Sequence, residues 1–133
     1  MIHITEILNN FLLENVITDF EIIYNDIFPE DESDCLISRY EPSEAKETEY
    51  IDGSAVGSVQ IGYLLRSSDA SKCRKVLNEI IERIDNISCK TEEGLEIRFS
   101  AVTLPNFISI DDKQQVIYSA TIKAEYTRPL EEN

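Results

Sequence analysis

The chain has 133 residues, of which 42% are hydrophobic, and we expect residues 1–133 to form a single domain with its own core. Its 26 acidic and 12 basic residues give a formal net charge of −14 at pH 7, which argues against sequence-specific binding to DNA phosphates. No stretch approaches the roughly 18 uninterrupted apolar residues of a membrane helix, and the first residues lack a basic leader, so we expect no membrane contact and no signal peptide.

The negative charge is distributed unevenly along the sequence. Residues 1–60 contain 14 acids and 2 bases, a net charge of −12, whereas residues 61–133 contain 12 acids and 10 bases, a net charge of −2. A solvated surface that keeps the protein in solution is the simplest interpretation. A surface that repels DNA is the alternative.

The first part of the chain is predicted to form one helix and two strands. Apolar residues recur with helical spacing between Ile4 and Val16, and residues 18–24 are rich in the β-branched and aromatic side chains that favour strands. An acidic turn at residues 29–34 precedes a short strand at residues 35–40. Residues 41–53 are acidic and contain few apolar side chains, which predicts a flexible loop.

A strand and an amphipathic helix are predicted in the centre of the chain. Between residues 55 and 65 apolar and polar side chains alternate, as in a strand with one buried face. A helix is predicted over residues 67–87, where apolar residues form a single stripe and Ser67, Ser68 or Asp69 can cap the first turn. The stripe consists of Cys73, Val76, Leu77, Ile80, Ile81, Ile84 and Ile87. We expect this stripe to pack on a sheet and the charged face to be solvated.

The C-terminal part is predicted to form a hairpin. Residues 95–104 alternate, Pro105 and Asn106 interrupt them, and residues 107–110 resume an extended conformation. A turn is predicted at residues 111–113, because Asp and Lys residues cluster there between extended segments.

One long strand completes the predicted fold. Residues 115–127 alternate for about a dozen positions, and the tail at residues 129–133 is expected to be loose. The predicted fold class is α+β, a mostly antiparallel sheet covered by two helices in the order α-β-β-β-α-β-β.

The sequence contains no constellation of residues that predicts catalysis. His3 is the only histidine, and the four glycines form no phosphate-binding loop. Asp111 and Asp112 are adjacent, which favours a hairpin turn over a pair of cooperating carboxylates. Residues 29–34 lack the spacing and the closing glutamate of an EF-hand, which favours a solvated turn over a calcium loop. We therefore expect no enzymatic activity and no cofactor.

The three cysteines, Cys35, Cys73 and Cys89, form no CxxC pair. An odd number argues against a disulfide framework, and a zinc site would need scattered ligands. We expect free, buried thiols in a reducing compartment, and no metal.

Contacts with other chains are the remaining route to function. The long C-terminal strand offers backbone groups to a neighbour. Three aromatic residues are candidate anchors of an interface, or else face the core, and three arginines either pair with acids of another subunit or belong to the ordinary charged surface. The aromatic candidates are Phe107, Tyr118 and Tyr126, and the basic candidates are Arg66, Arg98 and Arg128.

This pattern of elements resembles the small tail-terminator or minor capsid proteins of long-tailed bacteriophages. The resemblance rests on the strand and helix VQIGYLLRSSDASKCRKVLNEIIERID and on the hairpin AVTLPNFISIDDKQQVIYSATIKAEYT. It covers the C-terminal part of the chain and the N-terminal helix, and the acidic residues 41–49 depart from it. It is a pattern of elements without a catalytic signature, so no role of a single residue is carried over.

The resemblance implies a structural protein of a phage or prophage. Proteins of this family are α+β subunits that form hexameric rings on the end of the tail tube, stop its growth and join the tail to the DNA-filled head. The implied partners are further copies of the chain, the tail tube protein and a head-completion protein. The implied location is the head–tail junction of the virion, after synthesis in the host cytoplasm.

If such a ring forms, DNA would pass through it without specific binding, and acidic side chains facing the lumen would keep the duplex sliding. The candidates for an acidic lumen or rim are Glu30, Asp31, Glu32, Asp34, Glu41, Glu44, Glu47 and Glu49. A second function remains open, that of a non-enzymatic adaptor or regulator, monomeric or dimeric, which binds one partner with the same fold.

Overall fold

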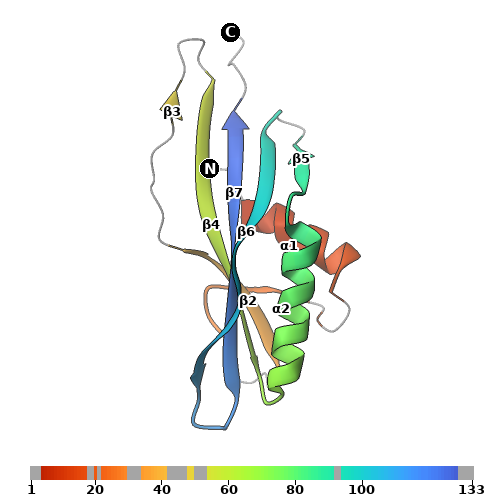
Figure 1. Ribbon diagram of the computed structural model, residues 1–133, viewed down its shortest axis with the longest axis vertical. Helices are drawn as coiled ribbons and strands as arrows, with labels where there is room; N and C mark the ends of the chain where they lie inside the picture. Colours follow the sequence, from red (N-terminus) through yellow and green to blue (C-terminus); the bar gives the residue numbers. More distant parts are fainter. Residues whose placement is uncertain are drawn as a thin grey trace.

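The computed structural model describes residues 4–17, 20, 22–29, 34–41, 48–49, 54–91 and 94–128. The elements are α1 (Ile4–Asn15), β1 (Tyr24–Asn25), β2 (Cys35–Glu41), β3 (Thr48–Glu49), β4 (Ala55–Ser67), α2 (Ala70–Ile84), β5 (Ser88–Lys90), β6 (Glu96–Ile110) and β7 (Val116–Arg128). The predicted fold class and order are confirmed, because two helices pack on a mostly antiparallel, curled sheet (Figure 1). The short strands β3 and β5 are additions to the predicted order.

The sheet is built around the long strands β4, β7 and β6. The strand order is β1-β2-β4-β7-β6-β5, with β3 beside β4. Neighbouring strands are antiparallel except β1 and β2, which are parallel. Strands β4 and β7 pair without a register shift from Ala55 opposite Arg128 to Ser67 opposite Val116. This ladder places β1 and β2 on one side of the sheet and β6 on the other.

Helix α2 covers the middle of the sheet with the predicted apolar stripe. The Asp69 carboxylate caps the helix, accepting hydrogen bonds from the backbone N–H groups of Ser71 at 3.0 Å and Lys72 at 3.3 Å. The buried residues of the helix are Cys73, Val76, Leu77, Ile80, Ile81 and Ile84. Helix α1 contributes Ile4, Leu8 and Leu12 to the same core, so both helices cover the same face of the sheet (Figure 1).

Helix α2 is shorter than predicted at both ends. Ser67 is the last residue of β4 and pairs with Val116, because backbone pairing continues to that point. The chain leaves the helix through Asn86, whose φ of 67° lies in the left-handed region that ends many helices. Ile87 follows the helix and is partly buried against the core.

The strand predicted at residues 18–24 is wrong for most of its described part. Only Tyr24 belongs to a strand, since β1 pairs with β2 through Tyr24 and Asn25 alone. Ile23 is buried in the core and Phe20 packs against it. Phe20 and Ile23 therefore pack on the core without forming a strand, whereas Ile22 is exposed. The β-branched and aromatic composition of the segment reflects packing and not strand pairing.

The segment predicted as an acidic loop contributes to the sheet in two places. Glu41 is the last residue of β2, opposite Gln60, and Thr48–Glu49 form β3 against Ala55 and Val56. Residues 42–47 and 50–53 lie outside the described residues, as does the tail at residues 129–133.

Strand β6 runs continuously through the predicted interruption at Pro105. The ladder with β7 shifts register between Ala101 and Thr103, between Thr103 and Asn106, and between Phe107 and Ser109. Pro105 lies inside the second shift, where it is not required to donate to the ladder. The proline is therefore accommodated by an irregular strand rather than by a break.

Candidate functional site

The C-terminal part of β6, residues 102–110, forms an exposed apolar edge, which we call the β6 edge. Its large exposed side chains are Val102, Leu104, Phe107, Ile108 and Ile110, of which Leu104 is 71% exposed. Five exposed large apolar residues within nine positions are far more than scattered surface hydrophobics require. Of these five residues, only Phe107 is a candidate interface anchor from the sequence.

The outer side of this segment has no strand neighbour among the described residues. Strand β5 pairs with β6 only as far as Arg98, and the Phe99 backbone then exchanges hydrogen bonds with Asn86 and Ile87. The N–H of Ala101 donates to the Asp85 carboxylate at 2.9 Å. Beyond Ala101 the described chain offers no further strand, so the β6 edge presents its backbone as well as its side chains.

An aromatic pair on the β6–β7 hairpin links the β6 edge to α2. The rings of Phe107 and Tyr118 meet edge to face, with centroids 5.8 Å apart and an interplanar angle of 77°. The Arg74 guanidinium donates to the Tyr118 hydroxyl at 3.1 Å and lies 5.8 Å from the centre of that ring. Two of the predicted interface residues are thus brought together. Arg74 was missed, because its helix position indicated only a solvated face.

Side chains hold the irregular hairpin in one shape. The Asn106 amide donates to the carbonyls of Leu104 at 3.0 Å and Ser119 at 3.1 Å. At the turn, the Asp111 carboxylate accepts from the backbone N–H groups of Lys113 and Gln115 at 2.9 and 2.8 Å. The predicted turn is confirmed. These hydrogen bonds fix the conformation of the hairpin, whose side chains lie outside the hydrophobic core.

A groove of about 590 Å³ lies at the other side of the sheet, between α1 and strands β1 and β2, and we call it the α1–β2 groove. It is lined by Thr5, Glu6, Asn9, Asn10, Leu13, Ile22, Ile23, Asn25, Asp26, Ser38, Arg39 and Tyr40. Ile22 and Tyr40 at this groove are 55% and 42% exposed. No signal in the sequence predicted the groove, because it depends on how α1 packs against β2.

A buried hydrogen-bond network underlies the α1–β2 groove. The Tyr63 hydroxyl donates to the Asn9 side-chain oxygen at 2.7 Å, and the Asn9 amide donates to the Ser38 hydroxyl at 2.8 Å. Ser38 in turn donates to the Asn25 side chain at 3.4 Å. Burial raises the pKa of the Tyr63 hydroxyl well above its usual value, so Tyr63 stays a neutral donor. The network ties α1, β1, β2 and β4 together beneath the groove.

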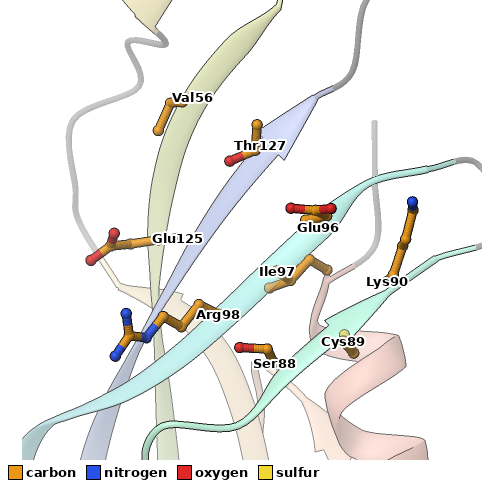
Figure 2. Close-up of a pocket in the computed structure, with 9 residues that line it drawn as sticks. All are labelled: Val56, Ser88, Cys89, Lys90, Glu96, Ile97, Arg98, Glu125 and Thr127. Carbon is orange, nitrogen blue, oxygen red and sulfur yellow. The ribbon is translucent and has the colours of Figure 1, made fainter.

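A second groove, of about 530 Å³, crosses the upper ends of β4 to β7 (Figure 2). It is lined by Val56, Ser88, Cys89, Lys90, Glu96, Ile97, Arg98, Glu125 and Thr127. Figure 2 shows Arg98 and Glu125 on the same side of the sheet, while Lys90 points away from them. Burial raises the pKa of the Cys89 thiol, so that thiol is a poor nucleophile, and none of the described lining residues is a histidine that could activate it.

The other basic and aromatic candidates are engaged within the chain or lie apart. The Arg66 guanidinium donates to the Pro29 carbonyl at 2.6 Å and lies 5.0 Å from the centre of the Phe28 ring. Tyr126 is partly buried against the core. Arg98 donates to the Asn86 side chain at 3.4 Å. The backbone of Arg128 ends β7, and its side chain lies outside the described part of the structure.

Only three of the eight acidic candidates fall in the described chain. Asp34 pairs with Lys72 at 2.8 Å, Glu41 pairs with Arg39 at 3.2 Å, and Glu49 belongs to β3. Partial burial by itself would raise the pKa of Asp34, but hydrogen bonds from Lys72 and Ser67 and the charge of Lys72 outweigh it, so this pKa is lowered. The candidates outside the described residues are Glu30, Asp31, Glu32, Glu44 and Glu47.

The cysteines are free thiols, as expected. Cys35 and Cys73 are buried, whereas Cys89 is only partly buried. Burial, together with the nearby charges of Asp34 and Asp69, raises the pKa of Cys73 to about 11. Within the described ranges no three His, Cys, Asp or Glu residues gather as metal ligands, and no described helix is long and apolar enough to span a bilayer.

The comparisons with known proteins point to one family. The family model described as bacteriophage tail terminator protein matches residues 11–128, which include every described strand, all of α2 and the C-terminal part of α1. No curated protein matches the sequence at a significant level. The matched range contains the β6 edge, the aromatic pair and most of the residues that line the α1–β2 groove. The chain therefore belongs to the bacteriophage tail terminator family.

Proposed function

We propose that this structural phage tail protein assembles with further copies of itself, as a hexamer, into a ring on the end of the tail tube. The ring stops tube growth and joins the tail to the head, through contacts with the tail tube protein and a head-completion protein. The observation that carries the proposal is the family match over residues 11–128. The exposed β6 edge supports it, because a protein that acts through contacts needs an apolar surface left uncovered in the isolated subunit.

The proposed ring is strongly anionic, since each subunit has a net charge of −14. Such a ring repels DNA phosphates and lets the duplex pass without specific binding. Asp34 and Glu41 each have a basic neighbour in the same subunit, which reduces their share of that field. We therefore assign the lumen or rim mainly to the acidic candidates in residues 30–32 and 44–49.

The same charge opposes assembly in free solution. Repulsion between subunits is screened over about 8–10 Å at physiological salt. Ring formation therefore increases with ionic strength, or with a tube end that acts as a template. In this function the protein acts by contacts alone and performs no enzymatic step.

Electron microscopy of tails assembled with and without the protein tests this function. With the protein, tails stop at their normal length and join heads, whereas without it we expect tubes of irregular length and tails that lack heads. Adding purified protein back restores both properties. Tails that reach normal length and join heads in its absence would exclude the terminator function and leave the adaptor function in its place.

A further inference from the structure

We infer that neighbouring subunits contact each other head to tail, with the β6 edge of one copy seated in the α1–β2 groove of the next copy. This inference rests on the proposed function, because it names the surfaces through which copies of the chain would form a ring. Its occupant is a second copy of this chain.

The exposed large hydrophobic residues divide into two groups at opposite sides of the sheet. Ile22, Ile27 and Tyr40 lie around β1 and β2, while the other group is the β6 edge. In Figure 1, the end of β6 lies at the lower left of the sheet, whereas α1 lies at mid-height on the right. Each subunit thus carries two apolar surfaces that it cannot bring into contact itself.

The two surfaces differ in shape. A protruding edge fits into a groove better than two edges or two grooves fit together. The β6 edge is an outer strand with five exposed large apolar side chains, and the α1–β2 groove is a hollow of about 590 Å³ lined partly by Leu13, Ile22, Ile23 and Tyr40. A hollow of this size accommodates several side chains. Among the described residues, β1 is the strand that lies beside β2 on this side, and it pairs with β2 at Ile37 and Ser38.

The groove has one more acid than bases, and two bases flank the β6 edge. Glu6 and Asp26 line the groove together with one base, Arg39. The β6 edge is flanked by Arg74, at the aromatic pair, and by Lys113, at the turn. Of the two acids at that turn, Asp111 is directed to backbone N–H groups. A contact between two grooves would instead bring together residues 1–60 of both copies, which contain 14 acids and 2 bases each and repel one another.

A contact between two different surfaces determines the kind of assembly. It is heterologous, so a growing row of subunits keeps one free β6 edge at one end and one free groove at the other until the row closes into a ring. A contact that used one surface twice would end at a dimer. The two-surface arrangement therefore fits a ring, whereas an isologous arrangement does not.

The test uses two variants that each damage one surface. Leu104→Asp places a charge on the β6 edge, and Ile22→Asp places one in the groove, both at side chains more than half exposed. Ser88→Asp adds the same charge on β5, away from both surfaces, and is the control. Circular dichroism and thermal unfolding of each variant verify that the fold is retained. Sedimentation velocity is measured over a concentration series from about 0.15 M to about 1 M salt, where the screening length falls from about 8 Å to about 3 Å.

We expect the wild type and Ser88→Asp to self-associate with rising concentration and salt. Each surface variant alone should lose about tenfold or more of this association, because a buried charge replaces an apolar anchor. In an equimolar mixture, the intact groove of Leu104→Asp receives the intact β6 edge of Ile22→Asp. The mixture therefore forms a one-to-one dimer and nothing larger.

Three results would overturn the inference: a wild type that stays monomeric throughout, a Leu104→Asp variant that associates like the control, or a mixture that forms no heterodimer. If tails made without the protein are normal but the mixed variants still pair, only the terminator function fails. If tails require the protein but the variants do not pair, only this interface fails.

Discussion

The two halves of strand β6 have opposite surroundings although they belong to one strand. In the first half, Ile97 and Phe99 are buried beneath α2, as is Leu95 just before the strand, while Glu96 and Arg98 between them are exposed. In the second half, residues 101–110, every residue but Pro105 is exposed, and five of them are large and apolar. Coverage by a helix therefore decides which half is core, and the half that no described element covers stays exposed.

Truncation of one phenylalanine in each half gives the largest contrast. Phe99 is 3% exposed and Phe107 is 55% exposed. We expect Phe99→Ala to lower the free energy of unfolding by about 3–5 kcal/mol, as for buried aromatic residues. Phe107→Ala should cost only about 0.5–1.5 kcal/mol, the value of its pair with Tyr118. Urea unfolding at high dilution measures both, and equal losses would show that the β6 edge is part of the monomer core.

Buried and exposed side chains can also be compared on helix α2, which covers the sheet. Ile80→Ala and Leu77→Ala remove fully buried side chains and should each cost about 2–5 kcal/mol. Glu82 is exposed and accepts one hydrogen bond from Asn78, so Glu82→Ala should cost less than about 0.5 kcal/mol. Chemical denaturation of the three variants tests which face of α2 packs on the sheet. If Glu82→Ala costs as much as Ile80→Ala, the assigned buried face of the helix is wrong.

The hydroxyls of Tyr63 and Tyr118 allow a buried hydrogen bond to be compared with an exposed one. Tyr63→Phe leaves the buried oxygen of Asn9 without its donor, which should cost about 1–3 kcal/mol. Tyr118→Phe removes an acceptor from the exposed Arg74 and should change stability by less than about 0.5 kcal/mol. Thermal and urea unfolding measure the difference. A small effect of Tyr63→Phe would mean that water replaces the lost hydroxyl beneath the α1–β2 groove.

The smallest expected effect concerns pH and the Asp34–Lys72 ion pair. Because the pKa of Asp34 is lowered on folding, its contribution to stability is present above the pKa of the unfolded chain, about 3.9, and is lost as pH falls through the folded value. The side chains of Asp34 and Lys72 are 32% and 30% exposed, so the contribution is below about 1 kcal/mol. Asp34→Asn should therefore lower stability at pH 7 and reduce the loss below about pH 4.

Asp112→Asn, at the exposed hairpin turn, is the matched control for this measurement. It removes the same charge at a residue without an ion pair among the described contacts, and it should change stability at pH 7 by less than about 0.5 kcal/mol. An Asp34→Asn variant with the same pH dependence as the wild type would show that the ion pair does not contribute in solution.

Local patterns in the sequence were sufficient for the elements that bury one face. The stripe from Cys73 to Ile84 and the alternation along β4 and β7 are read directly from neighbouring residues, because helix and strand periodicities relate each side chain to a single core. Phe107 and Tyr118 were selected from the sequence because exposed aromatic residues anchor interfaces. Their face-to-edge contact was not predictable, since it depends on the irregular register of β6 and β7.

Tertiary structure alone decided the features that depend on distant residues. Whether Ile23 forms a strand or covers the core, and whether β6 continues through Pro105, depends on the strand that lies beside each segment. The α1–β2 groove requires Asn9, Ser38 and Tyr63 to meet across 54 positions of sequence. Arg66 and Asp34 resemble free surface charges in the sequence, but packing brings them to Phe28 and Lys72. Coverage is a property of the packed layers, and single residue types do not specify it.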